Sequence, residues 1–413
     1  MTGRSFRHDV VVVGARAAGA ATAMLLARAG LDVLVVDRGR YGADTLSTHA
    51  LMRGAVVQLH RWGLLDAVVA VGTPAVRATT FSYASDEITV PVKLSHGVDA
   101  LYAPRRTVLD PILVDAAEAL GVTFRFGIRV TDVTRDERGR VDGVSGRDEQ
   151  GRPVGWRARW VVGADGVHSS IAQAVGAPVE HRSEGVTASV YGYWTGLEAE
   201  GYEWYFRPNA CAGVIPTNGD AACVFAIARP RRIGRGGRHA FDDVVAEAAP
   251  ALPARLARAA APAGVRSFAG IPGYLRRPYG PGWALVGDAG YWKDPIGAHG
   301  LTDALRDAEL LARAVTVAFA GGDERAAMQE YHRLRDELSL PLFTVVDEVA
   351  ALDWTEEEIP QLLRRLSMTM TDEVDAMSRY GASSAPTRSA RTIGAQSARR
   401  RTAAPADRSV RAS

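Results

Sequence analysis

The sequence predicts an α/β protein with a parallel sheet, an inserted and mostly antiparallel β domain, and helices at its C-terminal end. Three features predict this architecture. From His8 to Arg38 an apolar strand, a glycine turn, a small-residue helix, a second apolar strand and an acidic residue follow one another. Residues 185–228 are rich in aromatic and β-forming residues, and helical periodicity runs from Leu301 to about Met377.

The segment from His8 to Arg38 indicates a Rossmann-like βαβ unit that holds a dinucleotide. Gly14 permits the tight turn from strand to helix, and Gly19 lets the helix pack closely on the sheet. The free N–H groups at the start of this helix then face a pyrophosphate. Asp37, directly after the second strand, is placed to accept hydrogen bonds from a ribose.

Arg16 stands where such turns usually have their middle glycine. Its side chain must either swing clear of the pyrophosphate or reach the phosphates itself as a charged donor. An α/β turn that binds nothing is the alternative. The agreement of strand, turn, helix, strand and acid in one order argues against that alternative.

Length and composition set the frame for this unit. With 413 residues, 47% of them hydrophobic, the chain is long enough for two interlocked domains. No apolar run approaches the ~18 residues of a membrane helix. Two cysteines, Cys211 and Cys223, are too few for a secreted disulfide framework, and we expect both to be reduced, half-buried strand residues of a cytoplasmic enzyme.

The net charge of +2 divides unevenly along the chain. Residues 380–413 carry seven Arg and one Asp, so the remainder is slightly acidic and does not resemble a nucleic-acid-binding surface. This tail has too little apolar content to pack, and we expect it to be disordered. The predicted parts are a discontinuous dinucleotide-binding domain (1–76, 95–184 and 265–330), a substrate domain (77–94 and 185–264) and C-terminal helices (331–379).

Two helix entries carry candidate site residues. The residues from Thr45 to Val69 have helical spacing, with Gly63 in the last turn, and His49 in the polar entry could face the ligand. A single histidine is more often a structural group. At the start of the next helix, Arg106 can donate a fork of hydrogen bonds to a phosphate or ribose, with a surface arginine as the alternative.

Two further motifs resemble the first, because each places an acidic residue after a strand and ahead of a helix. Asp165 follows a strand and precedes Ser residues that can cap a short helix. Asp288 follows the strand from Trp283 to Val286, and the loop from Pro295 to Gly300 leads into a long helix whose N–H groups face an electron-rich ligand edge. Residues 230–237 contain three glycines but lack a preceding strand and an acid in register, so they predict a loop.

The order of these three motifs resembles that of FAD-dependent monooxygenases of the single-component aromatic hydroxylase type. Their superfamily also includes geranylgeranyl-reductase-like enzymes and flavin halogenases, and the resemblance covers roughly residues 8–320. It implies a Rossmann-like FAD-binding domain. The candidate catalytic residues in this sequence are His49 and His299. The residues it assigns to FAD are Gly14, Arg16, Ala18, Gly19, Asp37, Arg38, Arg106, Val130, Asp165, Asp288, Pro295, Gly297, Gly300 and Leu301.

Three departures from the family pattern leave the subfamily and the substrate open. Ile171-Ala172 stands where the Asp-Gly motif usually ends in Val-Arg. Gly290-Tyr291 replaces the Ala-His that usually closes the Gly-Asp motif. Ala298-His299-Gly300 stands where the family often has Gly-Gln-Gly.

The resemblance implies an enzyme that reduces FAD with NAD(P)H and then uses O2 to oxygenate an aromatic or polyketide-like small molecule, in bacterial secondary metabolism. Only one dinucleotide unit is visible, so the nicotinamide coenzyme would bind without a domain of its own. We expect no nucleic-acid partner, and either a monomer or a homodimer.

Three alternatives remain. The first is a reductase or dehydrogenase acting on a prenyl or polyketide chain, because the runs Asp44 to His49 and Pro104 to Asp110 resemble that branch too. The second is a flavin halogenase, which needs a reactive lysine. Lys93 is the only candidate outside the loop next to the flavin, which holds the other lysine, Lys293, and a surface lysine is the simpler interpretation. The third is a non-catalytic, FAD-binding redox-sensing module.

Overall fold

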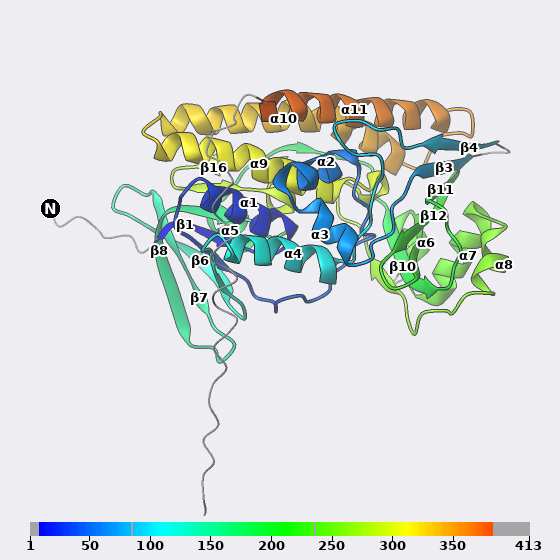
Figure 1. Ribbon diagram of the computed structural model, residues 1–413, viewed down its shortest axis with the longest axis horizontal. Coiled ribbons are helices and arrows are strands. Elements are labelled where there is room, and N and C mark those ends of the chain that lie inside the picture. Colours follow the sequence, from blue (N-terminus) through cyan, green and yellow to red (C-terminus); the bar gives the residue numbers. More distant parts are fainter. Residues whose placement is uncertain (1–7, 84–85, 235–236, 383–413) are drawn as a thin grey trace, which may run out of the picture.

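The computed structural model describes residues 8–83, 86–234 and 237–382, and it confirms the predicted fold class. Figure 1 shows α10 and α11 along one long side of the molecule, above α9, with the strands β6 to β8 at one end and the helices α6 to α8 at the other. None of the described helices is long and apolar enough to cross a membrane.

The first sheet has eight strands and a parallel centre in the order β17-β8-β1-β2-β5. The strand β16 and the hairpin β6–β7 add antiparallel partners at its margins. Valines of β1 and β2 are fully buried, because a parallel sheet is covered on both faces. The strands are β1 (His8–Val13), β2 (Val33–Val36), β5 (Thr123–Arg125), β6 (Arg129–Arg135), β7 (Val141–Arg147), β8 (Pro153–Gly163), β16 (Tyr279–Gly280) and β17 (Trp283–Leu285).

The second sheet has seven strands in the order β14-β10-β13-β12-β11-β3-β4. Its neighbours are antiparallel except for β3 and β11, which run parallel. One face is covered by α6 to α8, and the aromatic residues of the other face belong to the main core of the molecule. The strands are β3 (Ala78–Tyr83), β4 (Asp86–Pro91), β10 (Ala188–Thr195), β11 (Tyr202–Arg207), β12 (Ala210–Thr217), β13 (Ala221–Ala228) and β14 (Arg266–Phe268).

A third, three-stranded sheet and the helices complete the fold. The strands of this sheet are β9 (Val179–Arg182), β15 (Tyr274–Arg276) and β18 (Tyr291–Trp292). The helices are α1 (Ala17–Arg28), α2 (Arg53–Trp62), α3 (Leu65–Ala70), α4 (Arg106–Glu118), α5 (Ser170–Ala174), α6 (Pro230–Ile233), α7 (Arg238–Ala248), α8 (Leu252–Leu256), α9 (Gly300–Phe319), α10 (Glu324–Ala350) and α11 (Ile359–Ala382), with short 3-10 turns η1 (Gly287–Ala289) and η2 (Pro295–Gly297).

Two element predictions were wrong in detail. The helix predicted from Thr45 begins only at Arg53 and is cut in two at Gly63, whose left-handed backbone (φ 75°) closes α2. Residues 230–233, predicted as a loop, form the short helix α6, which Pro230 starts because its fixed φ suits a first helical turn.

The remaining predictions concern the cysteines and the tail. Cys211 and Cys223 are free but completely enclosed by the second sheet, so the expectation that they are half-buried was wrong. The last helix runs to Ala382, past the predicted end near Met377. Most of the tail predicted to be disordered, residues 383–413, lies outside the described residues.

Candidate functional site

The first glycine turn is a tight crossing of three backbone segments. Gly14 has φ 109°, and a Cβ atom there would lie 2.3 Å from the carbonyl oxygen of Ala164, just after β8. A Cβ atom at Gly19 would lie 1.8 Å from the carbonyl oxygen of Gly14. Both positions therefore require glycine, and the amino end of α1 lies directly against the sheet edge.

Asp37 binds the backbone of this turn. Its Oδ2 accepts a hydrogen bond from the N–H of Ala15 at 2.7 Å, and its Oδ1 accepts one from the N–H of Gly39 at 2.5 Å. Each carboxylate oxygen has a further lone pair, so the geometry leaves room for the predicted ribose contact. Arg38 is exposed beside it, and Asp37 lines a small cleft with Arg16, Asp110 and Phe126.

Arg16 and Arg106 share a single carboxylate. Arg106 donates two hydrogen bonds to Asp110, at 2.9 and 3.0 Å, and Arg16 contacts the same carboxylate at 3.4 Å. Arg16 also donates to the backbone oxygens of Ala43 and Asp44. Its pKa is lowered by burial and by the neighbouring Arg106. This pair carries one positive charge more than Asp110 neutralises, beside the helix end that is expected to face a pyrophosphate.

The second predicted motif acts on its own helix. Asp165 accepts hydrogen bonds from the hydroxyl of Ser169 at 2.5 Å and from the N–H of Ser170 at 2.7 Å, so it closes the amino end of α5. Val130 has a buried side chain within an apolar cluster under the first sheet. Contacts of these two residues with a cofactor stay predictions.

The Gly-Asp motif packs directly on α1. Gly287 has φ 58°, and a Cβ atom there would lie 2.9 Å from the Cβ of Ala18. The next residue, Asp288, hydrogen-bonds through its carboxylate to no other residue in the described part of the chain. Burial raises the pKa of Asp288 to about 6. An unpaired carboxylate at this place fits a hydroxyl-bearing ligand such as the ribityl chain of a flavin.

Residues 293–299 connect β18 to α9 and are called the flavin loop below. Asp294 accepts hydrogen bonds from the N–H and the hydroxyl of Thr187, both at 2.7 Å, and this ties the loop to the second sheet. A Cβ atom at Gly297 would lie 2.8 Å from the side chain of Val346 in α10. Pro295 and Gly297 lie in η2, and Gly300 and Leu301 begin α9.

His299 points from this loop into a buried ionic cluster. Its Nε2 lies 2.7 Å from Oε2 of Glu373 in α11, and its buried Nδ1 has no hydrogen-bond partner in the described ranges of the chain. Arg306 binds Glu373 and Asp303, each at 3.0 Å. Lys293 pairs with Asp303 as well, and burial followed by the charge of Arg306 lowers the lysine's pKa to about 7. His299, which was predicted to be catalytic, therefore contacts the C-terminal helix α11. Its partner Glu373 belongs to no sequence motif and could not be predicted.

His49 has a different environment. Its Nε2 lies 2.6 Å from the hydroxyl oxygen of Tyr193 in the second sheet, and the two rings stack with centroids 5.6 Å apart. Only 1% of the residue is exposed and its φ is 70°. Within residues 8–83, 86–234 and 237–382, no group hydrogen-bonds to its Nδ1. Burial, and then the charges of Arg105 and Arg106, lower the pKa of His49 to about 3. This histidine is neutral at physiological pH.

A second pair of arginines shares a carboxylate next to His49. Oδ2 of Asp44 lies 3.1 Å from Arg105 and 2.9 Å from Arg266. The guanidinium of Arg105 lies 3.7 Å above the ring of Tyr193. Asp44 and Arg105 occur in the two sequence runs already noted, but Arg266 and Tyr193 lie in strands and have no motif that could identify them.

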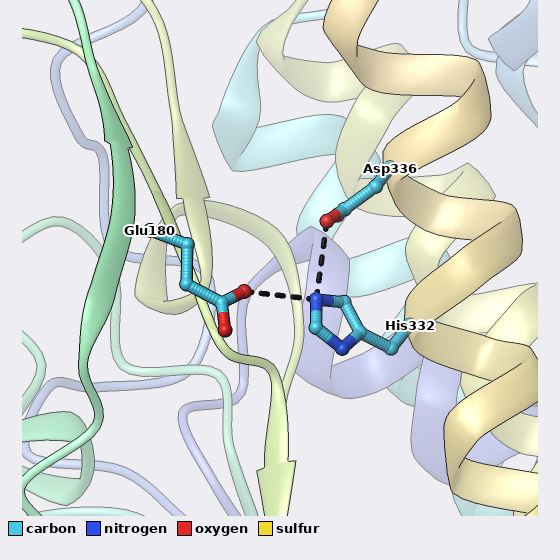
Figure 2. Close-up of side chains that lie close together, drawn as sticks. All are labelled: Glu180, His332 and Asp336. Atoms are coloured by element: carbon cyan, nitrogen blue, oxygen red, sulfur yellow. Dashed lines mark ion pairs between the residues drawn. The ribbon is translucent and has the colours of Figure 1, made fainter.

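Figure 2 shows a separate cluster, in which His332 of α10 lies between Asp336 and Glu180 of β9. The Nε2 of His332 is 2.9 Å from Glu180 and 3.1 Å from Asp336. Arg277 also pairs with Glu180, and Arg335 with Asp336. Both carboxylates thus already have cationic partners, and the cluster ties the third sheet to α10.

The fold and the motifs are those of a flavoprotein. Comparison with known families agrees: the model of the FAD binding domain family matches residues 7–341, and the chain belongs to this family. The resemblance inferred from the motifs is confirmed, and the protein is an FAD-dependent oxidoreductase.

Three relatives show the range of this superfamily. Menaquinone reductase of Mycolicibacterium smegmatis is 30% identical over 75% of this chain and 76% of its own length. Digeranylgeranylglycerophospholipid reductase 2 of Methanopyrus kandleri is 28% identical over 80% and 82%. Ubiquinone hydroxylase UbiL of Rhodospirillum rubrum is 25% identical over 90% and 87%.

Two solved structures have the same fold. The flavin-dependent brominase Bmp2 superposes with a TM-score of 0.74 at 18% identity, over 91% of this chain and 100% of its own. PqsL of Pseudomonas aeruginosa, in complex with 2-aminobenzoylacetate, has a TM-score of 0.69 at 21% identity, over 86% and 99%.

Proposed function

We propose that the protein is an NAD(P)H-dependent monooxygenase that hydroxylates or epoxidises an aromatic or polyketide-like small molecule. One observation carries this proposal: Asp294 of the flavin loop accepts two hydrogen bonds from Thr187, directly before β10, the strand that carries Tyr191 and Tyr193. A flavin above the loop would face these rings, which suit a flat apolar substrate. The aromatic residues of β10, β11 and β13 on this face of the second sheet are Tyr191, Tyr193, Tyr202, Trp204, Phe206 and Phe225.

The protein's own residues would bind FAD, orient the substrate and shield the reaction from water. Gly14, Gly19 and the Arg16–Arg106 pair would hold the pyrophosphate, Asp37 the ribose and Asp288 the ribityl chain. The neutral His49 and the hydroxyl of Tyr193 form a fixed pair that would orient a polar group of the substrate or move a proton. FAD, when bound, supplies electron transfer from NAD(P)H and the reaction with O2.

A reductase of isoprenoid compounds is the second candidate. The observation that favours it is the menaquinone reductase at 30% identity over three quarters of both chains. A halogenase has less support, because Lys93 is exposed and Lys293 is buried in an ion pair with Asp303. A redox-sensing module would keep the FAD site and turn over no substrate.

Oxygen uptake separates these activities. The purified holoprotein is supplied with NADPH or NADH and a panel of aromatic acids, phenols and prenylated quinones, and O2 and coenzyme are followed together. A monooxygenase consumes O2 and coenzyme in equal amounts when product forms. Loss of a prenyl double bond without O2 uptake would establish the reductase instead. If none of the compounds is turned over, the sensing module is favoured.

A further inference from the structure

We propose that Arg105 and Arg266 hold an acidic group of the substrate, so that the enzyme acts on organic acids rather than neutral aromatics. The inference rests on the proposed function, in which the substrate lies against the aromatic face of the second sheet. It assigns a carboxylate or phosphate of the substrate to the border of that face.

The charges around Asp44 do not balance. Arg105 and Arg266 both bind the same oxygen of this carboxylate, at 3.1 and 2.9 Å. Its other oxygen accepts the N–H of Thr45 at 2.9 Å. Within the described part of the chain, Asp44 is the only carboxylate paired with either arginine. One positive charge therefore lacks an anionic partner, and a half-buried guanidinium gains most from a second anion.

The pair is open to a solute and held in position. The side chain of Arg105 is 23% exposed and that of Arg266 is 42% exposed. Arg105 is fixed over the ring of Tyr193, and its buried Nε has no hydrogen-bond partner among the residues that the structure describes. A planar guanidinium that is already held in place loses less entropy when it binds an oxyanion.

The pyrophosphate of FAD does not account for this charge. Arg105 and Arg106 are adjacent in sequence, but their side chains bind different carboxylates, Asp44 and Asp110. The pair around Asp110 lies beside the amino end of α1 and has its own unbalanced charge for the pyrophosphate. The pair around Asp44 instead reaches the second sheet, because Arg266 begins β14.

The neighbouring groups fit the rest of such a substrate. The hydroxyl of Tyr191 accepts the N–H of Ser47 at 3.1 Å, and Tyr193 carries both the Arg105 stack and the His49 contact. An acid held by the two arginines would place its ring along these tyrosines. His49, whose buried Nδ1 has no partner, lies at the same place.

The test is a titration of the flavin absorbance of the holoprotein with benzoate and with benzamide, which share their shape and differ in charge. We expect benzoate to bind at least tenfold more tightly than benzamide. Arg105→Gln and Arg266→Gln should each weaken benzoate about 10- to 100-fold, because a charge-assisted hydrogen bond is lost, and leave benzamide unchanged. Arg258→Gln, which removes an exposed arginine elsewhere, is the matched control.

A variant that binds benzoate more tightly must be folded, so a predicted gain of benzoate affinity does not depend on variants that fail to fold. Asp44→Asn removes the competing charge and keeps a hydrogen-bond acceptor, so it should tighten benzoate binding several-fold. Equal binding of benzoate and benzamide, binding of neither, or unchanged benzoate affinity in the arginine variants would overturn the proposal.

NADPH distinguishes the other source of an anion. If the arginine variants lose NADPH affinity and keep benzoate affinity, the pair serves the coenzyme phosphates and the proposal is wrong. No turnover, O2 or coenzyme is needed for the benzoate titration. Failure of the monooxygenase proposal would therefore show in oxygen uptake and leave this result intact.

Discussion

The loops that contain His49 and His299 both precede a helix and both offer a candidate catalytic histidine, but the two histidines have different surroundings. Both histidines are almost fully buried, and both have an Nδ1 without a partner. His49 contacts a tyrosine of the second sheet and lies among arginines, whereas His299 contacts Glu373 within an ionic cluster that reaches α11. Burial alone therefore does not distinguish the two histidines; their partners do, because His49 contacts the proposed substrate face and His299 contacts α11.

The largest effect is expected at the ionic cluster. Glu373→Ala leaves His299, Arg306 and Lys293 without a charge that now offsets them, and breaking such a buried pair costs about 3–5 kcal/mol. Urea denaturation should show this loss. Glu348→Ala, which breaks an exposed pair with Arg365, is the control and should cost at most about 1 kcal/mol. Similar stability of both variants would mean that the cluster does not hold α11.

Asp37→Ala should purify with most of its FAD lost. The carboxylate accepts two backbone hydrogen bonds of the glycine turn, and each charge-assisted hydrogen bond contributes ~1.5–3 kcal/mol. The ratio of flavin to protein absorbance measures the occupancy. Full retention of FAD would show that Asp37 is neither the ribose partner nor needed to hold the turn.

His49→Asn and His299→Asn test the comparison itself. Asparagine tolerates the left-handed backbone at position 49, so the fold and FAD content should be retained. Turnover should fall about a hundredfold or more if the His49–Tyr193 pair acts as an acid or base. His299→Asn should lower the unfolding midpoint and keep turnover per bound flavin. The reverse pattern would exchange the roles of the two loops.

The pH dependence of stability sharpens the assignment of His49. Its pKa falls from 6.5 to about 3 on folding, so the unfolded chain binds this proton and the folded protein does not. His49 does not change the free energy of unfolding above the unfolded pKa. As pH falls from about 6.5 towards 3, it lowers the free energy of unfolding. His49→Asn should therefore flatten the loss of stability over that window. Parallel pH profiles of the two proteins would contradict a neutral, buried His49.

The smallest effect is expected at Lys93. This lysine is exposed, so Lys93→Ala should leave FAD content, flavin reduction and product formation unchanged. Product analysis alongside flavin reduction measures both steps. Loss of product with normal flavin reduction would favour a halogenase.

The dinucleotide turn could be predicted because its constraints are local. Gly14 and Gly19 are required by backbone atoms within one βαβ unit, and the carboxyl end of β2 places Asp37 beside them. Asp165 could be recognised as part of a motif. Its role in capping α5 depends on the backbone turn that brings the hydroxyls of Ser169 and Ser170 to its carboxylate.

The rest of the site depends on contacts between distant segments. Tyr193 meets His49 only because β10 lies beside the loop after β2, and Glu373 meets His299 only because α11 folds back over α9. Neither contact corresponds to a motif or a regular residue spacing that could be recognised in the sequence. The break at Gly63 and the irregular stretch before Arg53 were missed because apolar periodicity continues through both.

The most direct measurement is the visible spectrum of the purified protein without oxygen, before and after addition of NADPH or NADH. A self-sufficient NAD(P)H-coupled oxygenase should show bound flavin that bleaches on addition of coenzyme, alone or once an aromatic acid is present. A flavin that stays oxidised with both coenzymes and every acid would contradict this function and point to a separate electron donor.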